Sequence, residues 1–192
     1  MKTLVNPPAL LILDVQKGFE DPSWGRRNNQ DAELNILKLL TEWRARGWEI
    51  IYSQHLSLLP KSPLHYQNKV GTEFKEIIKP LPQEVIFQKN VNSAFIGTKL
   101  ETYLRDKLIT SVVITGLSTQ HCVSTTTRMS KNLGFETFLV EDATAAFEIT
   151  DHMGTFFPPE AVHKHEIAAL HKEFATIVKT DNILKQVNGV GD

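Results

Sequence analysis

The chain has a single cysteine, Cys122, among its 192 residues. One cysteine excludes a disulfide within the chain and excludes any zinc module built from several cysteines. A free thiol is most stable in a reducing compartment, so the expected location is cytoplasmic. What this one thiol does is the main question that the sequence raises.

The chain also lacks an excess of charge of either sign. Its 21 Lys and Arg and 22 Asp and Glu give a formal net charge of -1. Neither nucleic acid nor an anionic membrane surface is therefore an expected partner. Long apolar runs are missing too, because the run over residues 9–13 ends at Asp14. No signal peptide or membrane-spanning helix is expected.

Glycine-rich phosphate loops are absent as well. The sequence contains no Gly-x-Gly-x-x-Gly after its first apolar run and no Gly-x-x-x-x-Gly-Lys-Ser/Thr. Dinucleotide binding and P-loop nucleotide binding therefore lack the backbone cradle that they need. Any chemistry must come from other residues.

Short apolar runs alternate with longer amphipathic segments along the whole chain. Strands are predicted over residues 9–15, 48–55, 84–89, 111–116, 135–142 and 174–180. Helices are predicted over residues 31–47, 97–108, 120–133 and 159–173, with a last one from about residue 181. This alternation predicts an α/β fold: a doubly wound, Rossmann-like three-layer α/β/α sandwich whose mostly parallel sheet has about six strands. Residues 1–192 are expected to form one domain.

Three titratable side chains lie at or just after three of these strands: Asp14, Lys89 and Cys122. The carboxyl ends of parallel strands meet at one edge of a sheet, where ligands bind. There, Lys89 and a helix N-terminus near residue 120 should lower the pKa of Cys122, and Asp14 could accept its proton. Alternatively, Cys122 fills the core, Asp14 caps a loop and Lys89 is solvated.

Three segments carry a resemblance to a known family: "LLILDVQKGF" (10–19), "QKNVNSAFIGTKL" (88–100) and the stretch from "VVITGLSTQHCV" to "EDATAAF" (112–147). In this order they resemble the isochorismatase-like cysteine hydrolases, which include nicotinamidases and N-carbamoylsarcosine amidase-type enzymes. The resemblance covers residues 9–184. It implies a catalytic triad of Asp14, Lys89 and Cys122, and a homo-oligomer.

The same resemblance implies a reaction. Cys122 would attack the carbonyl of a small-molecule amide, release ammonia or an amine, and leave a thioester for water to hydrolyse. It further implies a cis peptide bond between Leu117 and Ser118, and an oxyanion hole formed by the N–H groups of Ser118 and Cys122.

Metal binding is not expected, nor is any other cofactor. Nicotinamidases of this family hold a metal with Asp-x-His after the second strand and a later histidine. Here the corresponding segment reads "SQHLSLLPKSPLH", with Gln54 near the place of the carboxylate and only His55 and His65 as ligands. Two histidines make a poor divalent-metal site. His55 is instead expected either in the wall of the substrate pocket or as a hydrogen-bond partner at the end of its strand.

Other candidates for the substrate pocket follow the Asp14 strand: Phe19, Trp24 and Arg27. An equally simple interpretation is that Trp24 covers the core and Arg27 is solvated. His121, beside Cys122, could also reach the pocket. As the preceding residue on a predicted helix, however, it should point elsewhere, and a contact between subunits is an equal alternative. Three later histidines are expected on the surface of another helix: His163, His165 and His171.

Two other functions remain open for this scaffold. An isochorismatase-type vinyl-ether hydrolase would need Asp14 but not a nucleophilic Cys122. A non-catalytic protein could use the same scaffold only to bind a small molecule. The presence of Cys122 together with Lys89 and Asp14 favours acyl transfer over both.

Overall fold

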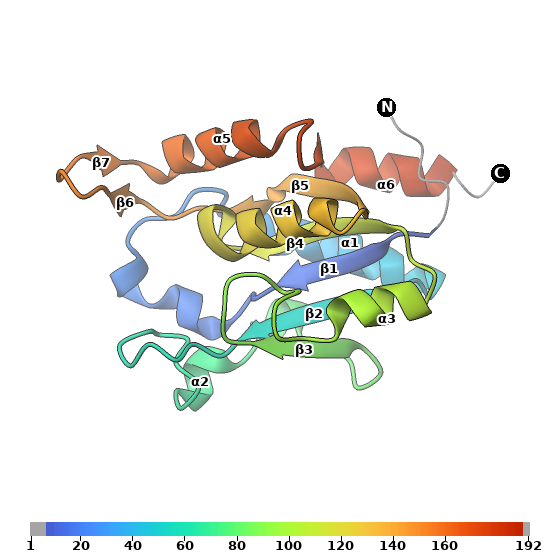
Figure 1. The fold of residues 1–192 in the computed structure, drawn as a ribbon, viewed down its shortest axis with the longest axis horizontal. Coiled ribbons are helices and arrows are strands. Elements are labelled where there is room, and N and C mark those ends of the chain that lie inside the picture. Colours follow the sequence, from blue (N-terminus) through green and yellow to red (C-terminus); the bar gives the residue numbers. More distant parts are fainter. Residues whose placement is uncertain (1–6, 190–192) are drawn as a thin grey trace.

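A computed structural model describes residues 7–189 (Figure 1). Its sheet has six parallel strands in the order β3-β2-β1-β4-β5-β8. The strands are β1 (Ala9–Leu13), β2 (Ile50–His55), β3 (Val85–Lys89), β4 (Ser111–Leu117), β5 (Glu136–Ala145) and β8 (Thr176–Val178). All six predicted strands are therefore confirmed. Within the described residues, no helix has the length and apolar character needed to cross a membrane.

Helices cover both faces of the sheet, so the predicted three-layer sandwich is confirmed (Figure 1). The helices α1 (Ala32–Arg46) and α6 (Thr180–Asn188) pack on one face. The other face is covered by α3 (Leu100–Asp106), α4 (Ser124–Asn132) and α5 (Pro159–Leu170). The central strand β1 is buried on both sides, because Leu10 and Ile12 join the first cluster and Leu11 and Leu13 join the second. This is the alternation of side chains along a strand.

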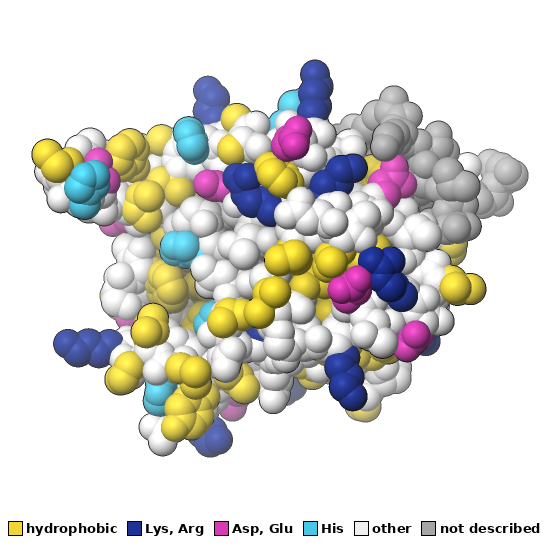
Figure 2. Space-filling model, in the orientation of Figure 1, with side chains coloured by type: hydrophobic (Ala, Val, Ile, Leu, Met, Phe, Trp, Pro, Cys, Tyr) yellow, Lys and Arg dark blue, Asp and Glu magenta, His cyan; other side chains and the backbone are white. Residues whose placement is uncertain are grey.

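Two short elements were not predicted. A hairpin of β6 (Ile149–Thr150) and β7 (Phe156–Phe157) extends beyond the sheet (Figure 1), and α2 (Lys69–Thr72) lies in the long loop after β2. The hairpin carries apolar side chains at its exposed end (Figure 2), where Met153 is 78% exposed. The helix predicted from residue 97 begins later, at Leu100. The predicted helix over 120–133 begins as a π-helical turn, Thr119–Val123, that carries Cys122.

The strand order determines where the site lies. From β1 the sheet grows through β2 to β3 on one side and through β4 to β5 and β8 on the other. Such a switch point leaves a crevice at the carboxyl ends of the central strands. Asp14 follows β1, Lys89 ends β3 and Cys122 follows β4, so the three candidates reach this crevice from three strands.

Gly116 permits the close approach of β4 to β1 beneath this crevice. Its φ is +116°, and a Cβ atom there would lie 2.1 Å from the Leu13 carbonyl oxygen. We expect Gly116→Ala to lower the free energy of unfolding in urea by about 3 kcal/mol or more. Gly47→Ala is the matched control, since Gly47 has a φ of +64° but nothing within 4 Å of the added atom. It should lose only about 1 kcal/mol. Equal losses would show that β4 can shift away from β1.

Candidate active site

Asp14 is held rigidly at the end of β1. Its side chain is fully buried, and its backbone is left-handed, with a φ of 53°. The carboxylate accepts a hydrogen bond from Ser53 Oγ at 2.6 Å through Oδ1, and Oδ2 lies 2.5 Å from Lys89 Nζ. The Asp14 N–H also donates to the Ser53 carbonyl at 3.1 Å. The neighbouring strand β2 thus fixes the direction of the carboxylate.

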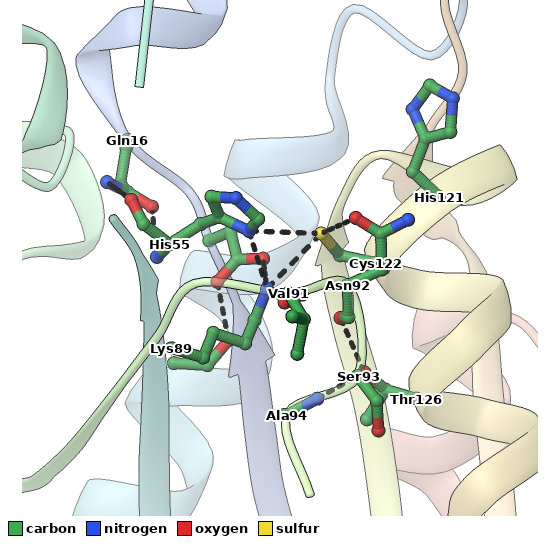
Figure 3. A network of polar contacts seen from close by, with 12 residues as sticks. Gln16, His55, Lys89, Val91, Asn92, Ser93, Ala94, His121, Cys122 and Thr126 are labelled. Atoms are coloured by element: carbon green, nitrogen blue, oxygen red, sulfur yellow. Dashed lines mark hydrogen bonds and ion pairs between the residues drawn. The ribbon is translucent and has the colours of Figure 1, made fainter. Parts of the chain in front are cut away.

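The Lys89 ammonium is the centre of the site (Figure 3). Besides Asp14, Nζ lies 3.0 Å from His55 Nδ1, 3.1 Å from the Val91 carbonyl oxygen and 3.2 Å from Cys122 Sγ. Burial alone would lower the pKa of Lys89, but the pKa is raised, and the negative charge of Asp14 is the largest cause that raises it. Lys89 is therefore a charged ammonium, and it joins Asp14 and Cys122, the other two predicted catalytic residues, in one network.

Cys122 lies on the π-helical turn after β4 and is 4% exposed. Burial, and next the negative charge of Asp14, raise the pKa of its thiol and outweigh the attraction of Lys89. The expectation of a lowered pKa is therefore wrong. The reason is that Asp14 and Lys89 already neutralise each other, so a thiolate would add an uncompensated buried negative charge. The resting nucleophile is a thiol with a carboxylate nearby, and its proton must leave as it attacks.

His55 fits both roles expected for it, since it lines the cavity beside Cys122 and its ring lies within hydrogen-bonding distance of Lys89 at the strand ends. Its Nδ1 is 3.7 Å from Cys122 Sγ as well as 3.0 Å from Lys89 Nζ. Burial, and then the charge of Lys89, lower the pKa of His55, so the ring is neutral and its Nδ1 accepts from the ammonium. Gln16 fixes this residue, because its side chain accepts from the His55 N–H at 2.8 Å and donates to the His55 carbonyl at 3.0 Å. Gln16 was missed; a polar residue two positions after Asp14 was its only signal.

The donor set does not fit a divalent cation. In the described part of the chain, one group of potential ligands lies close together: Asp14, His55 and Cys122, with ligand atoms within 4.8 Å of one another. Lys89 Nζ contacts an atom of each of the three, so an ammonium occupies the position that a metal ion would need. His65 takes no part, since its Nδ1 accepts from the Gln67 N–H and its ring packs on Tyr66.

A cavity of about 240 Å³ opens beside Cys122. Phe19 and Trp24 line it with ring centroids 5.0 Å apart, and both rings pack on Phe147. Trp24 also covers part of the core, so both roles considered for it are seen. The other lining residues include His55, Ser57, Ser62 and Asn92. Asn92, which sequence reasoning missed, places Oδ1 3.8 Å from Cys122 Sγ.

Arg27 was expected in this cavity, and the structure places it elsewhere. Its guanidinium binds both carboxylate oxygens of Glu33, at 2.6 and 2.8 Å. Lys75 Nζ lies 2.9 Å from the same carboxylate. Arg27, in the segment after β1, and Lys75, in the loop after β2, therefore both bind helix α1 through Glu33.

This ion cluster should make stability depend on pH. Burial opposes ionisation of Glu33, but Arg27 and Lys75 outweigh it and lower the pKa from 4.5 to about 2. The contribution of ionised Glu33 to the free energy of unfolding is therefore complete above about pH 5 and disappears as the pH falls towards 2. We expect Glu33→Gln to lose about 3 kcal/mol of unfolding free energy at pH 7, and less at pH 3. Glu101→Gln, which removes an exposed pair with Arg105, should lose less than about 0.5 kcal/mol. A loss for Glu33→Gln that did not depend on pH would contradict the electrostatic origin.

The segment before Cys122 forms the edge of the cavity. The peptide bond between Leu117 and Ser118 is cis, and Ser118 lines the cavity with Cys122. His121 was expected to point elsewhere. Its ring points away from the Cys122 side chain (Figure 3), but it lines the cavity edge, and its Nδ1 lies 3.1 Å from Ser118 Oγ.

His163 was expected on the surface of α5, and this is wrong. Its Nδ1 lies 3.0 Å from Thr119 Oγ1, so it supports the turn that carries Cys122. Burial lowers the pKa of His163, which keeps the ring neutral. His165 and His171 are exposed, as expected.

Comparison with known proteins gives one consistent family. The model of the Isochorismatase domain matches residues 8–182. The isochorismatase family protein YrdC of Bacillus subtilis is 55% identical over 176 residues, covering 92% of this chain and 94% of that protein. Nicotinamidase 3 of Arabidopsis thaliana is 27% identical over 197 residues, covering 94% and 89%. A crystal structure assigned to a hydrolase of the isochorismatase family from Chromobacterium violaceum has a TM-score of 0.93 and 37% identity, covering 98% and 97%.

Proposed function

Because the chain belongs to the isochorismatase family of hydrolases, we propose that it cleaves the C–N bond of a small-molecule amide through a thioester on Cys122. One observation carries the proposal: Lys89 Nζ lies 2.5 Å from Asp14 Oδ2 and 3.2 Å from Cys122 Sγ. A proton acceptor, a cation and a thiol thus meet beside a cavity of small-molecule size. The name of Nicotinamidase 3 indicates amide chemistry in a relative that aligns over most of this chain.

In the first half of the reaction, Asp14 takes the Cys122 proton as Sγ attacks the carbonyl carbon. The C–S bond forms, and the carbonyl oxygen becomes an oxyanion. Asp14 then gives the proton to the amide nitrogen, the C–N bond breaks, and ammonia or an amine leaves. Lys89 offsets the negative charge that passes between sulfur and carboxylate.

In the second half, Asp14 takes a proton from water as the water oxygen attacks the thioester carbon. A second tetrahedral intermediate collapses, the C–S bond breaks, and the sulfur is reprotonated from Asp14. The carboxylic acid leaves, and the site returns to a neutral thiol with an ionised Asp14. No proton is gained or lost by the enzyme over the cycle.

Two backbone groups would bind the oxyanion in both halves: the N–H groups of Ser118 and Cys122. Both residues line the cavity; Ser118 directly precedes the π-helical turn after β4, and Cys122 lies on that turn. Hydrogen bonds from a fixed backbone need no rearrangement as charge develops on the oxygen. The reaction needs no cofactor in this scheme, because Lys89 supplies the positive charge.

Trapping the thioester tests this function. A panel of small amides is screened for ammonia release, and active compounds are repeated with hydroxylamine, which converts a thioester to a hydroxamate. We expect hydroxamate at the expense of carboxylic acid, and an acid-quenched protein heavier by the acyl group on Cys122. Ammonia release with neither a hydroxamate nor an adduct would contradict covalent catalysis.

A further inference from the structure

The Lys89 ammonium has more neighbours than hydrogens. An ammonium group carries three N–H donors and no acceptor. Four groups lie within hydrogen-bonding distance of its Nζ (Figure 3): Asp14 Oδ2 at 2.5 Å, His55 Nδ1 at 3.0 Å, the Val91 carbonyl oxygen at 3.1 Å and Cys122 Sγ at 3.2 Å. One of the four is therefore left without a hydrogen of its own.

The sulfur is the weakest of these four acceptors. Asp14 offers a carboxylate and Val91 a backbone carbonyl, whereas a thiol sulfur accepts only weakly. Burial, and then the charge of Lys89, lower the pKa of His55, so its ring is neutral and has a lone pair free at Nδ1. This Nδ1 also lies closer to Nζ than Sγ does. The imidazole therefore wins the third hydrogen over the thiol.

We propose that His55 is a positioning residue: its Nδ1 holds the third hydrogen of the Lys89 ammonium and thereby leaves Cys122 a neutral thiol in the resting enzyme. The thiol is then free to donate, and Asn92 Oδ1 lies 3.8 Å from Sγ as an acceptor. The inference rests on the proposed function for its purpose. A Cys122 that meets the amide as a thiol brings the proton that Asp14 passes to the leaving nitrogen.

Strand register places His55 beside Lys89. The two residues are the last of the parallel strands β2 and β3, and they pair with each other in the sheet. The Leu56 N–H donates to the Lys89 carbonyl at 2.7 Å, and Gln16 binds both backbone groups of His55, at 2.8 and 3.0 Å. The imidazole therefore starts from a fixed backbone, level with the ammonium that it contacts.

The charges around the thiol give the direction of the expected effect. Burial, and next the charge of Asp14, raise the pKa of Cys122, and Lys89 lowers it. After burial, the charges that shift the pKa of His55 are those of the same two residues. Removing only the acceptor at position 55 leaves both charges in place and frees a hydrogen of Lys89 for Sγ. The pKa of the thiol should therefore fall.

Alkylation by iodoacetamide at pH 7 tests this competition, and Cys122 is the only thiol that can react. In His55→Leu we expect alkylation about 10-fold faster or more than in wild type, the effect of one hydrogen bond from a charged donor on the thiol pKa. His55→Asn keeps an acceptor oxygen at the δ1 position and should alkylate within about threefold of wild type. An unchanged rate in His55→Leu, or an equal acceleration in both variants, would overturn the proposal.

The Lys89→Met variant separates this effect from easier access to the sulfur. Without the ammonium there is no hydrogen to compete for, so adding His55→Leu to Lys89→Met should change the alkylation rate by less than about threefold. If His55→Leu accelerates alkylation as much in Lys89→Met as in wild type, the histidine only shields the thiol, and the proposal is wrong.

The tautomer of His55 provides a test on the unaltered protein. An Nδ1 that accepts from Lys89 requires the ring proton on Nε2. We expect ¹⁵N NMR at pH 7, with His55 assigned by the signal missing from His55→Asn, to show the Nε2–H tautomer. A proton on Nδ1 would overturn the proposal. None of these experiments uses a substrate, so the failure of amide hydrolysis in the hydroxylamine experiment and the failure of this inference are separate results.

Discussion

Replacing Cys122 with alanine is expected to lower kcat for amide hydrolysis by about 10⁴-fold or more, because the nucleophile that forms the thioester is removed. Cys122 Sγ lies 3.2 Å from Lys89 Nζ at the edge of the cavity, and no other thiol exists in the chain. Alanine keeps the backbone of the turn and both N–H groups of the proposed oxyanion hole. The loss should therefore appear in kcat, while the KM for the amide changes little.

The control for this variant is Thr127→Ala on α4, the helix that continues from the turn carrying Cys122. Thr127 is fully buried, and its hydroxyl has no hydrogen-bond partner among the described residues. It should keep kcat within about threefold, and both variants should unfold within about 1.5 kcal/mol of wild type. A Cys122→Ala protein with full turnover would contradict covalent catalysis. That result would instead mean that water attacks the amide directly, with Asp14 as its general base.

The positions of the candidate residues could be predicted because they depend on strand order alone. Apolar runs that end at Asp14, at Lys89 and before Cys122 give the strands, and parallel strands bring their carboxyl ends to one edge. The hairpin of β6 and β7 was missed because each strand has two residues, too few to show a period of two.

The energetics of the site could not be predicted in this way. Lys89 lowers the pKa of Cys122, whereas burial and the charge of Asp14 raise it. Which effect is larger depends on the distances between these groups. The sequence also does not show that Lys89 Nζ contacts His55, or that Arg27 binds Glu33 six residues later rather than a substrate. These contacts depend on where side chains of different elements meet.

Replacing Asp14 with asparagine should have opposite effects on turnover and on thiol reactivity. Turnover should fall by about 10³-fold or more, because the proton acceptor is lost. The negative charge of Asp14 helps to raise the pKa of Cys122, so its removal leaves Lys89 unopposed and lowers that pKa. Alkylation by iodoacetamide at pH 7 should therefore become about 10-fold faster or more, since each pKa unit changes the thiolate fraction tenfold. Wild-type alkylation should still rise above pH 9.

A second substitution shows whether faster alkylation comes from a lower thiol pKa or from greater solvent exposure of the thiol. Asparagine suits position 14, since it tolerates the left-handed φ of 53° and can still accept the Ser53 hydrogen bond. In Asp14→Asn/Lys89→Met the ammonium is gone too, so the thiol pKa should rise again and alkylation at pH 7 should slow to the wild-type rate. If the double variant alkylates as fast as Asp14→Asn, the thiol has become more exposed rather than more ionised. If Asp14→Asn alkylates no faster than wild type, Asp14 does not control the Cys122 proton, and its place in the mechanism is wrong.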